Sequence, residues 1–322
     1  MVKIHFLSVG HGDCTVIEHA SGNLTVVDIN DRSSFSNEAE KAIYEEAGVD
    51  ETVQALYRAL GTKHPALKSA EEKLVDPVGF IKTNFPDRPI FRFICTHPDM
   101  DHLSGLCRLH HEQKVAIWNF WDIEHQKRMS EDDFKDSPFK YHDWVWYMYL
   151  SGRLAPEHES PARVIHALRG DQRDYWQQDG LTILHPTIDF LKAANEREGD
   201  KYNDCSYVIQ VHCGAAAVTL GGDAEGSSWA DIWSNHEKEA LASQILKASH
   251  HGRDTGYHKE AVDAMKPSYT VFSAGKKPSN DAYDKYRSHG IEVLRTYTHG
   301  TITATCDESG TVLLEDSQGH VL

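Results

Sequence analysis

The sequence contains no apolar run of the roughly 20 residues needed to cross a bilayer, and its N-terminal MVKIHFLSVG enters a strand-like alternation without a charged leader. Its six cysteines include no CxxC pair, a spacing typical of zinc and redox motifs. There is no internal repeat and no low-complexity tract. These absences predict a soluble, unexported, cytoplasmic protein with reduced thiols and no membrane contact.

Basic residues are scarce relative to acidic ones. The chain has 33 Lys and Arg against 49 Asp and Glu, a formal net charge of -16. Such a surface repels a long polyanion unless a local basic groove exists, so extended wrapping of nucleic acid is disfavoured. The length of 322 residues predicts one large domain, 1–322, with insertions.

Strand-like segments lie at both ends of the chain. Residues 2–9, 14–18 and 24–28 alternate or are apolar, and further such runs follow residue 206 with helical stretches between them. This pattern favours an α/β fold with two sheets packed face to face and flanked by helices. Residues 36–75 predict a helical insertion, and the aromatic segment 115–150 predicts either a helical hairpin that packs its own aromatics or a lid over a site.

Four side chains that can bind metal follow the apolar strand 91–96. They are His97, Asp99, Asp101 and His102, within six consecutive positions. Imidazole nitrogens and carboxylate oxygens are suitable ligands for divalent cations, and polar groups at the carboxyl end of a buried strand commonly carry chemistry. A solvated polar loop is the alternative interpretation of this segment.

Two later strands end in the same way. Asp223 follows an apolar strand and a glycine pair, where the backbone can approach a ligand closely, and His250 and His251 follow the strand ILKAS. Separately, these are also typical of a turn and a surface loop. Three clusters of ligand side chains at strand ends in one chain together favour a metal site.

In order and combination, the motifs resemble those of a known family. FLSVGHGDCTVIE, VVDIN, CTHPDMDHLSGL, YNDCSYVIQV, TLGGDAE and LKASHHG look like the soluble metallo-β-lactamase domain of ComEC-type competence proteins. The resemblance implies a metallo-β-lactamase αββα sandwich with helical and aromatic insertions. It leaves residues 31–89 and 107–180 without counterpart, and these are the expected insertions.

The resemblance also implies a centre for two divalent ions. His97 and Asp99 would hold one ion, Asp101 and His102 the second, and Asp223 would bridge both. Extra carboxylate suits harder metals, so Mn²⁺ is as credible as Zn²⁺. No other cofactor is expected.

Two ligand positions remain open. His250 would complete the second ion's ligands, since the strand directs it inward and His251 elsewhere; a turn at Ser249 would exchange the two histidines. The superfamily histidine of the first ion is absent, and Asn203, Asp204 or water would replace it. His250→Ala is therefore expected to cost more activity than His251→Ala.

A two-metal centre suits phosphodiester hydrolysis. Asp101 would orient the attacking water and accept its proton, and His299 would donate to a phosphate or leaving group, unless it is an ordinary loop histidine. The expected substrate is a nucleotide, a short single-stranded nucleic acid or another small anionic phosphodiester. The alternatives are a ComEC-like nuclease of single-stranded DNA, a lactamase or lactonase, and a non-catalytic metal-binding regulatory module.

Overall fold

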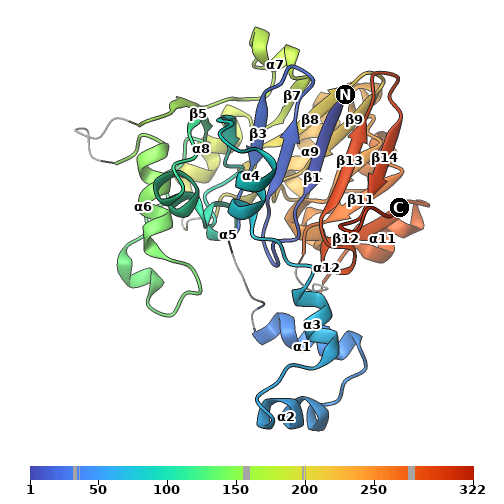
Figure 1. The fold of residues 1–322 in the computed structure, drawn as a ribbon. Helices are drawn as coiled ribbons and strands as arrows, with labels where there is room; N and C mark the ends of the chain where they lie inside the picture. The colour runs from blue at the N-terminus through green and yellow to red at the C-terminus, as the bar shows by residue number, and fades with distance from the viewer. Residues whose placement is uncertain (32–34, 36, 155–159, 198, 200, 275–279) are drawn as a thin grey trace.

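The computed structural model describes residues 1–31, 35, 37–154, 160–197, 199, 201–274 and 280–322. Within these residues the chain forms two mixed β-sheets that lie face to face, with helices on the outer faces (Figure 1). This four-layer arrangement confirms the predicted αββα sandwich.

The first sheet has eight strands in the order β14-β13-β1-β2-β3-β4-β5-β6. Neighbouring strands from β3 to β6 pair in parallel, and the other neighbouring strands pair antiparallel. Because β1 pairs with β13, the two ends of the chain close the same sheet. Its strands are β1 Val2–Phe6, β2 Thr15–Glu18, β3 Leu24–Val27, β4 Ile90–Ile94, β5 Ile117–Trp121, β6 Arg163–Ile165, β13 Ile302–Cys306 and β14 Val312–Glu315.

The second sheet has six strands in the order β12-β11-β10-β9-β8-β7. Strands β9 to β12 are parallel, so their carboxyl ends lie at one edge of the sheet. Its strands are β7 Leu181–His185, β8 Val208–Cys213, β9 Ala216–Leu220, β10 Ile245–Lys247, β11 Tyr269–Phe272 and β12 Glu292–Arg295.

Helices cover the two outer faces. Apolar side chains of α4 and α6 pack on the first sheet, and those of α9, α10 and α11 pack on the second. No helix of the described ranges is both long and apolar enough to cross a membrane. The helices are α1 Asn37–Glu46, α2 Glu51–Ala59, α3 Pro65–Glu71, α4 Pro77–Asn84, α5 Met100–Leu103, α6 Tyr141–Leu150, α7 Asp174–Gln178, α8 Ile188–Glu196, α9 Gly226–Asn235, α10 Lys259–Met265, α11 Tyr283–Ser288 and α12 Thr296–His299.

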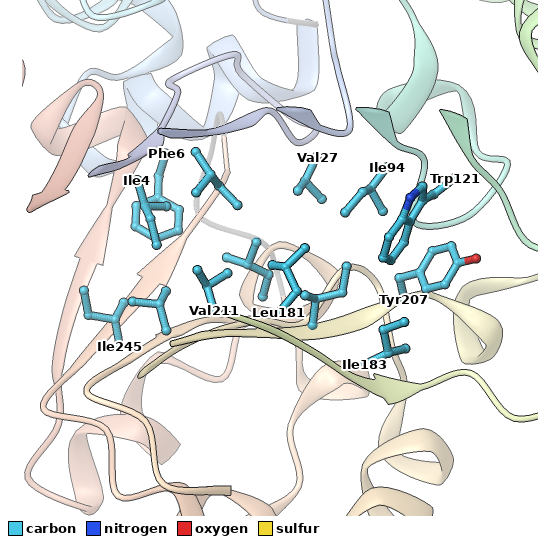
Figure 2. Close-up of a cluster of buried hydrophobic side chains, with 14 of the residues drawn as sticks. Ile4, Phe6, Val27, Ile94, Trp121, Leu181, Ile183, Tyr207, Val211 and Ile245 are labelled. Carbon is cyan, nitrogen blue, oxygen red and sulfur yellow. The ribbon is translucent and has the colours of Figure 1, made fainter. Parts of the chain in front are cut away.

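The main core lies between the sheets. Burial of these apolar side chains supplies the main favourable free energy of folding, at roughly 25 cal/mol for each Å² removed from water. Figure 2 shows side chains of the two sheets meeting in this layer, among them Ile4, Phe6, Val27, Ile94, Trp121, Leu181, Ile183, Val211 and Ile245.

The two expected insertions differ in how they join the sandwich. Helices α1 to α3 form a group with its own small core around Tyr44 and Leu67, and they project from one end of the sandwich (Figure 1). Helix α4, within the same expected bounds of 31–89, instead packs on the first sheet. Segment 107–180 supplies strands β5 and β6 to that sheet.

The helical hairpin predicted over residues 115–150 is wrong. Its first part is β5, because Ile117, Phe120 and Trp121 are buried and the strand pairs with both β4 and β6. A short 3₁₀ helix, Glu131–Phe134, and α6 follow it. Trp144 and Tyr147 of α6 pack in the core on the outer face of the first sheet. The aromatic density of this segment therefore serves mainly the packing of the first sheet.

Candidate metal centre

The three predicted ligand clusters meet at one edge of the sandwich. They follow strands β4, β9 and β10. The glycine pair after β9 permits this approach, because a Cβ on Gly221 would lie 2.2 Å from the Ser249 hydroxyl oxygen. At Gly222, whose φ is +50°, a Cβ would lie 3.0 Å from the Tyr207 carbonyl oxygen. Only glycine allows the Asp223 loop to pack this tightly.

Two imidazoles are oriented by hydrogen bonds on their outer nitrogens. His102 Nδ1 lies 2.9 Å from an Asp28 carboxylate oxygen, and His251 Nδ1 lies 3.1 Å from the Ser273 carbonyl oxygen. Such bonds fix the tautomer and leave Nε2 free to bind a cation. The Nε2 atoms of His102, His251 and also His97 are buried and have no hydrogen-bond partner among the described residues.

Carboxylate oxygens face these free nitrogens. Asp223 places one oxygen 3.4 Å from His102 Nε2 and the other 3.4 Å from His251 Nε2, and Asp101 lies 3.3 Å from His251 Nε2. Ligand atoms bonded at about 2.0 to 2.2 Å to a tetrahedral cation are separated by roughly 3.4 Å. The spacing therefore fits divalent ions. The side chains fall into two overlapping groups of potential ligands that share His251: His102, Asp223 and His251 with Asp13, and Asp101 and His251 with His11.

The electrostatics of the cluster favour a bound cation. Burial alone would lower the pKa of His251, but the carboxylates of Asp223 and Asp13 outweigh it and raise this pKa to about 9. Burial likewise opposes ionisation of Asp223, yet His251 and His102 hold its pKa well below the usual range. Without metal, protons on the imidazoles balance the carboxylates, and a cation that binds would displace these protons.

Asp13 and Lys247 form a buried ion pair behind the two imidazoles. Asp13 lies 3.6 Å from His251 Nδ1 and 3.9 Å from His102 Nδ1, the nitrogens that already donate elsewhere. Asp13 is close enough to join the His102, Asp223 and His251 cluster as a ligand, but its contacts with Lys247 and the Nδ1 atoms suit a supporting role. Sequence reasoning missed both residues, although Asp13 stands in the quoted motif FLSVGHGDC.

The proposed first-ion ligands form a less complete set. His97 Nε2 lies 3.5 Å from one oxygen of Asp99, and Lys127 Nζ lies 2.6 Å from the other. In the ranges that the structure describes, no third His, Cys, Asp or Glu joins this pair in a metal-like group. Asp204 instead binds Arg197, at 2.6 and 2.7 Å.

Lys127 is expected to position Asp99. Lys127→Met should weaken binding of a metal at this pair by about tenfold, because Asp99 loses the charged hydrogen bond that orients its carboxylate. Titration of the apoprotein with Mn²⁺ and Zn²⁺ by calorimetry measures this change. Lys135→Met is the matched control, since that lysine pairs with Asp132 on the exposed surface. Equal metal affinity in both variants would contradict the role of Lys127.

His251 faces two carboxylates of the centre, Asp101 and Asp223, at 3.3 and 3.4 Å, whereas His250 Nε2 lies 3.8 Å from Asp223 alone. Residues Ser249–Gly252 form a 3₁₀ turn in which His250 and His251 have φ of 51° and 57°, so the alternation of the strand does not continue. His250 Nδ1 donates to Thr255 at 2.7 Å and Nε2 accepts from Arg253 at 3.1 Å. Burial lowers the pKa of His250 to about 4. We therefore transfer the proposed ligand role to His251.

His299 and Asn203 are not members of the cluster. His299 ends α12, and the charges that act on its side chain are those of Asp316, Lys73 and Glu292. Asn203 begins the short turn Asn203–Cys205, and His299 belongs to no metal-like group of the described chain. A role for either residue remains a prediction.

Comparison with known proteins agrees with the resemblance inferred from the motifs. No family model matches the chain. It is 31% identical over 132 residues to competence protein ComA of Neisseria gonorrhoeae, covering 39% of this chain and 18% of that protein. It is 28% identical over 105 residues to ComE operon protein 3 of Bacillus subtilis, covering 31% of this chain and 13% of that protein. The chain thus spans less than a fifth of these two relatives.

A third relative and three solved structures extend the comparison. The chain is 25% identical over 172 residues to protein YcaI of Escherichia coli, covering 52% of this chain and 21% of that protein. A mutant of CmlA beta-hydroxylase has a TM-score of 0.49 and 12% identity, and the match covers 94% of this chain and 53% of that one. The metallo hydrolase Igni18 of Ignicoccus hospitalis has a TM-score of 0.43 and 14% identity, with 94% and 98% covered. Zn²⁺-bound PqqB of Methylobacterium extorquens has a TM-score of 0.41 and 10% identity, with 92% and 98% covered.

Proposed function

We propose that this protein is a metal-dependent phosphodiesterase that acts on a nucleotide, a short single-stranded nucleic acid or another small anionic phosphodiester. The observation that carries the proposal is the convergence of buried, unpartnered atoms, His102 Nε2, His251 Nε2 and Asp223 Oδ1, at one strand-end edge. Buried polar atoms without partners are costly, so their grouping supports a cation as the missing partner.

Each side chain of the centre has a distinct part in the proposed reaction. A divalent ion bound there would supply Lewis acidity toward a phosphoryl oxygen and toward water. Asp101 is the most accessible of the four proposed ligands, with 21% of its side chain exposed, which supports the proposal that it orients the attacking water and accepts its proton. Asp28 and Ser273 keep the two imidazoles in one tautomer.

The substrate class is proposed from charge and from the names of the relatives. Two relatives are named for competence or the ComE operon, which supports testing single-stranded DNA. The net charge of -16 favours short over long strands, because repulsion grows with the number of phosphates near the surface. Lactam and lactone hydrolysis remain the alternatives for the same centre.

Purified protein is expected to bind one or two divalent transition-metal ions per chain, with one ion bound more tightly because one ligand set is more complete. Metal analysis after reconstitution with Mn²⁺ or Zn²⁺ measures this stoichiometry. The loaded protein should then hydrolyse bis(p-nitrophenyl) phosphate faster than a lactam or lactone. Less than about 0.2 metal equivalents would overturn the centre, and metal binding without any turnover would favour the regulatory module.

A further inference from the structure

Arg253 lies beside the candidate metal centre and connects two histidines at its border. One guanidinium nitrogen lies 3.1 Å from His250 Nε2, and the other lies 3.2 Å from His11 Nε2. A guanidinium has only donors, so both imidazole nitrogens must accept and both rings must be neutral. Arg253 therefore keeps its full positive charge in these contacts.

Arg253 has no carboxylate partner in the part of the chain that the structure describes. It is the one half-buried arginine of the described residues that is not within ion-pair distance of Asp or Glu. The other half-buried arginines have such a partner, in the pairs Arg88–Glu18, Arg108–Asp76, Arg153–Asp122, Arg169–Asp231 and Arg295–Asp281. The fully buried Arg92 pairs with Asp179. A half-buried, unpaired guanidinium is costly unless a ligand anion binds it.

The histidines that Arg253 contacts place it near the proposed ligands. His250 Nε2 lies 3.8 Å from an oxygen of Asp223, and the His11 ring centroid lies 4.7 Å from that of His251. A divalent ion would neutralise much of the charge of Asp101 and Asp223. The Arg253 charge would then be in excess at this border and would attract an anion.

We propose that Arg253 is the substrate-binding residue of the centre, and that its guanidinium receives a non-bridging oxygen of a phosphate group. This inference rests on the proposed phosphodiesterase function and adds to it a specificity-determining residue. A planar guanidinium can give two parallel hydrogen bonds to one phosphate. The three N–H groups of Arg253 that do not face His11 or His250 remain for such bonds.

The test compares Arg253→Ala, Arg253→Gln and Arg253→Lys with the wild-type protein, all loaded with the same metal. Arg163→Ala serves as control, because Arg163 is exposed on β6. Calorimetry measures binding of inorganic phosphate, metal analysis checks the centre, and steady-state kinetics with bis(p-nitrophenyl) phosphate separates KM from kcat. Acetate is the second anion, since it lacks the phosphate geometry.

Arg253→Ala and Arg253→Gln should weaken phosphate binding by about tenfold or more and raise KM in proportion. Arg253→Lys should recover part of this loss, and metal content and the control should remain unchanged. Wild-type phosphate affinity in Arg253→Gln would overturn the proposal. Loss of metal in both the Gln and Lys variants would also overturn it, because Arg253 would then support the ligands. Absence of phosphodiester turnover in wild-type protein would refute the proposed function, while the phosphate titration still tests Arg253.

Discussion

His251→Ala should reduce the affinity of the tight metal site by at least about 100-fold, whereas His250→Ala should reduce it by less than about tenfold. His251 Nε2 faces both Asp223 and Asp101, at 3.4 and 3.3 Å, so its loss removes a ligand from the middle of the cluster. His250 instead has both ring nitrogens hydrogen-bonded, to Thr255 and Arg253. This order reverses the one expected from strand alternation alone.

Adjacent positions make these two variants a matched pair. Metal titrations with Mn²⁺ and Zn²⁺ measure the affinities, and circular dichroism must show native secondary structure for each variant. Hydrolysis of bis(p-nitrophenyl) phosphate at saturating metal should follow the same order. Tighter metal binding by His251→Ala than by His250→Ala would show that the turn at Ser249–Gly252 directs the other imidazole into the centre.

Asp223→Ala should abolish metal-dependent turnover, with a decrease of at least about 1,000-fold that excess metal only partly repairs. The two carboxylate oxygens of Asp223 face two different imidazoles, His102 and His251. Removal of Asp223 takes away the main negative charge that faces these two rings. The remaining side chains would therefore bind a cation less favourably.

Stability and activity must be separated for this variant. Asp223 is buried, so urea unfolding of apoprotein and metal-loaded protein should accompany the kinetics. In the wild-type protein, metal should raise the free energy of unfolding, because it binds the folded state alone; in Asp223→Ala this increase should vanish. Asp132→Ala is the control, since that carboxylate is exposed. Wild-type turnover in folded Asp223→Ala would assign the activity to another site or a contaminant.

Local pattern was sufficient for the layers of the fold and for most of the cluster. Alternating and apolar runs reveal strands because side chains of a strand point to opposite faces. Polar ligand candidates directly after three strands are visible in the sequence, because chemistry in α/β folds commonly sits at strand carboxyl ends. Strand β4 belongs to the first sheet and β9 and β10 to the second, so the packing of the two sheets brings the three clusters to one edge. The structure brings together the predicted His102, Asp101 and Asp223.

The aromatic segment shows where such reasoning fails. The sequence pattern predicts a helix for the run IWNFW, although its dense aromatics suit a helix and a strand equally. Its strand character depends on pairing with β4 and β6. Pairing is a long-range contact that no window of sequence contains. The contact of Lys127, from the same segment, with Asp99 is likewise between residues far apart in the chain. Nothing in the local sequence of Lys127 indicates it.

By itself, the sequence determined the class of fold, the chemistry of the ligands and the strand ends from which they come, because these depend on periodicity and residue type. Only the tertiary structure shows that His251 faces more carboxylates than His250, since backbone dihedrals after Ser249 set the direction of each ring. It also shows that Asp13 pairs with Lys247 beside the centre and that Arg253 contacts two histidines and, among the described residues, no carboxylate. Such pairings depend on distances between segments far apart in the chain, which neither composition nor spacing specifies.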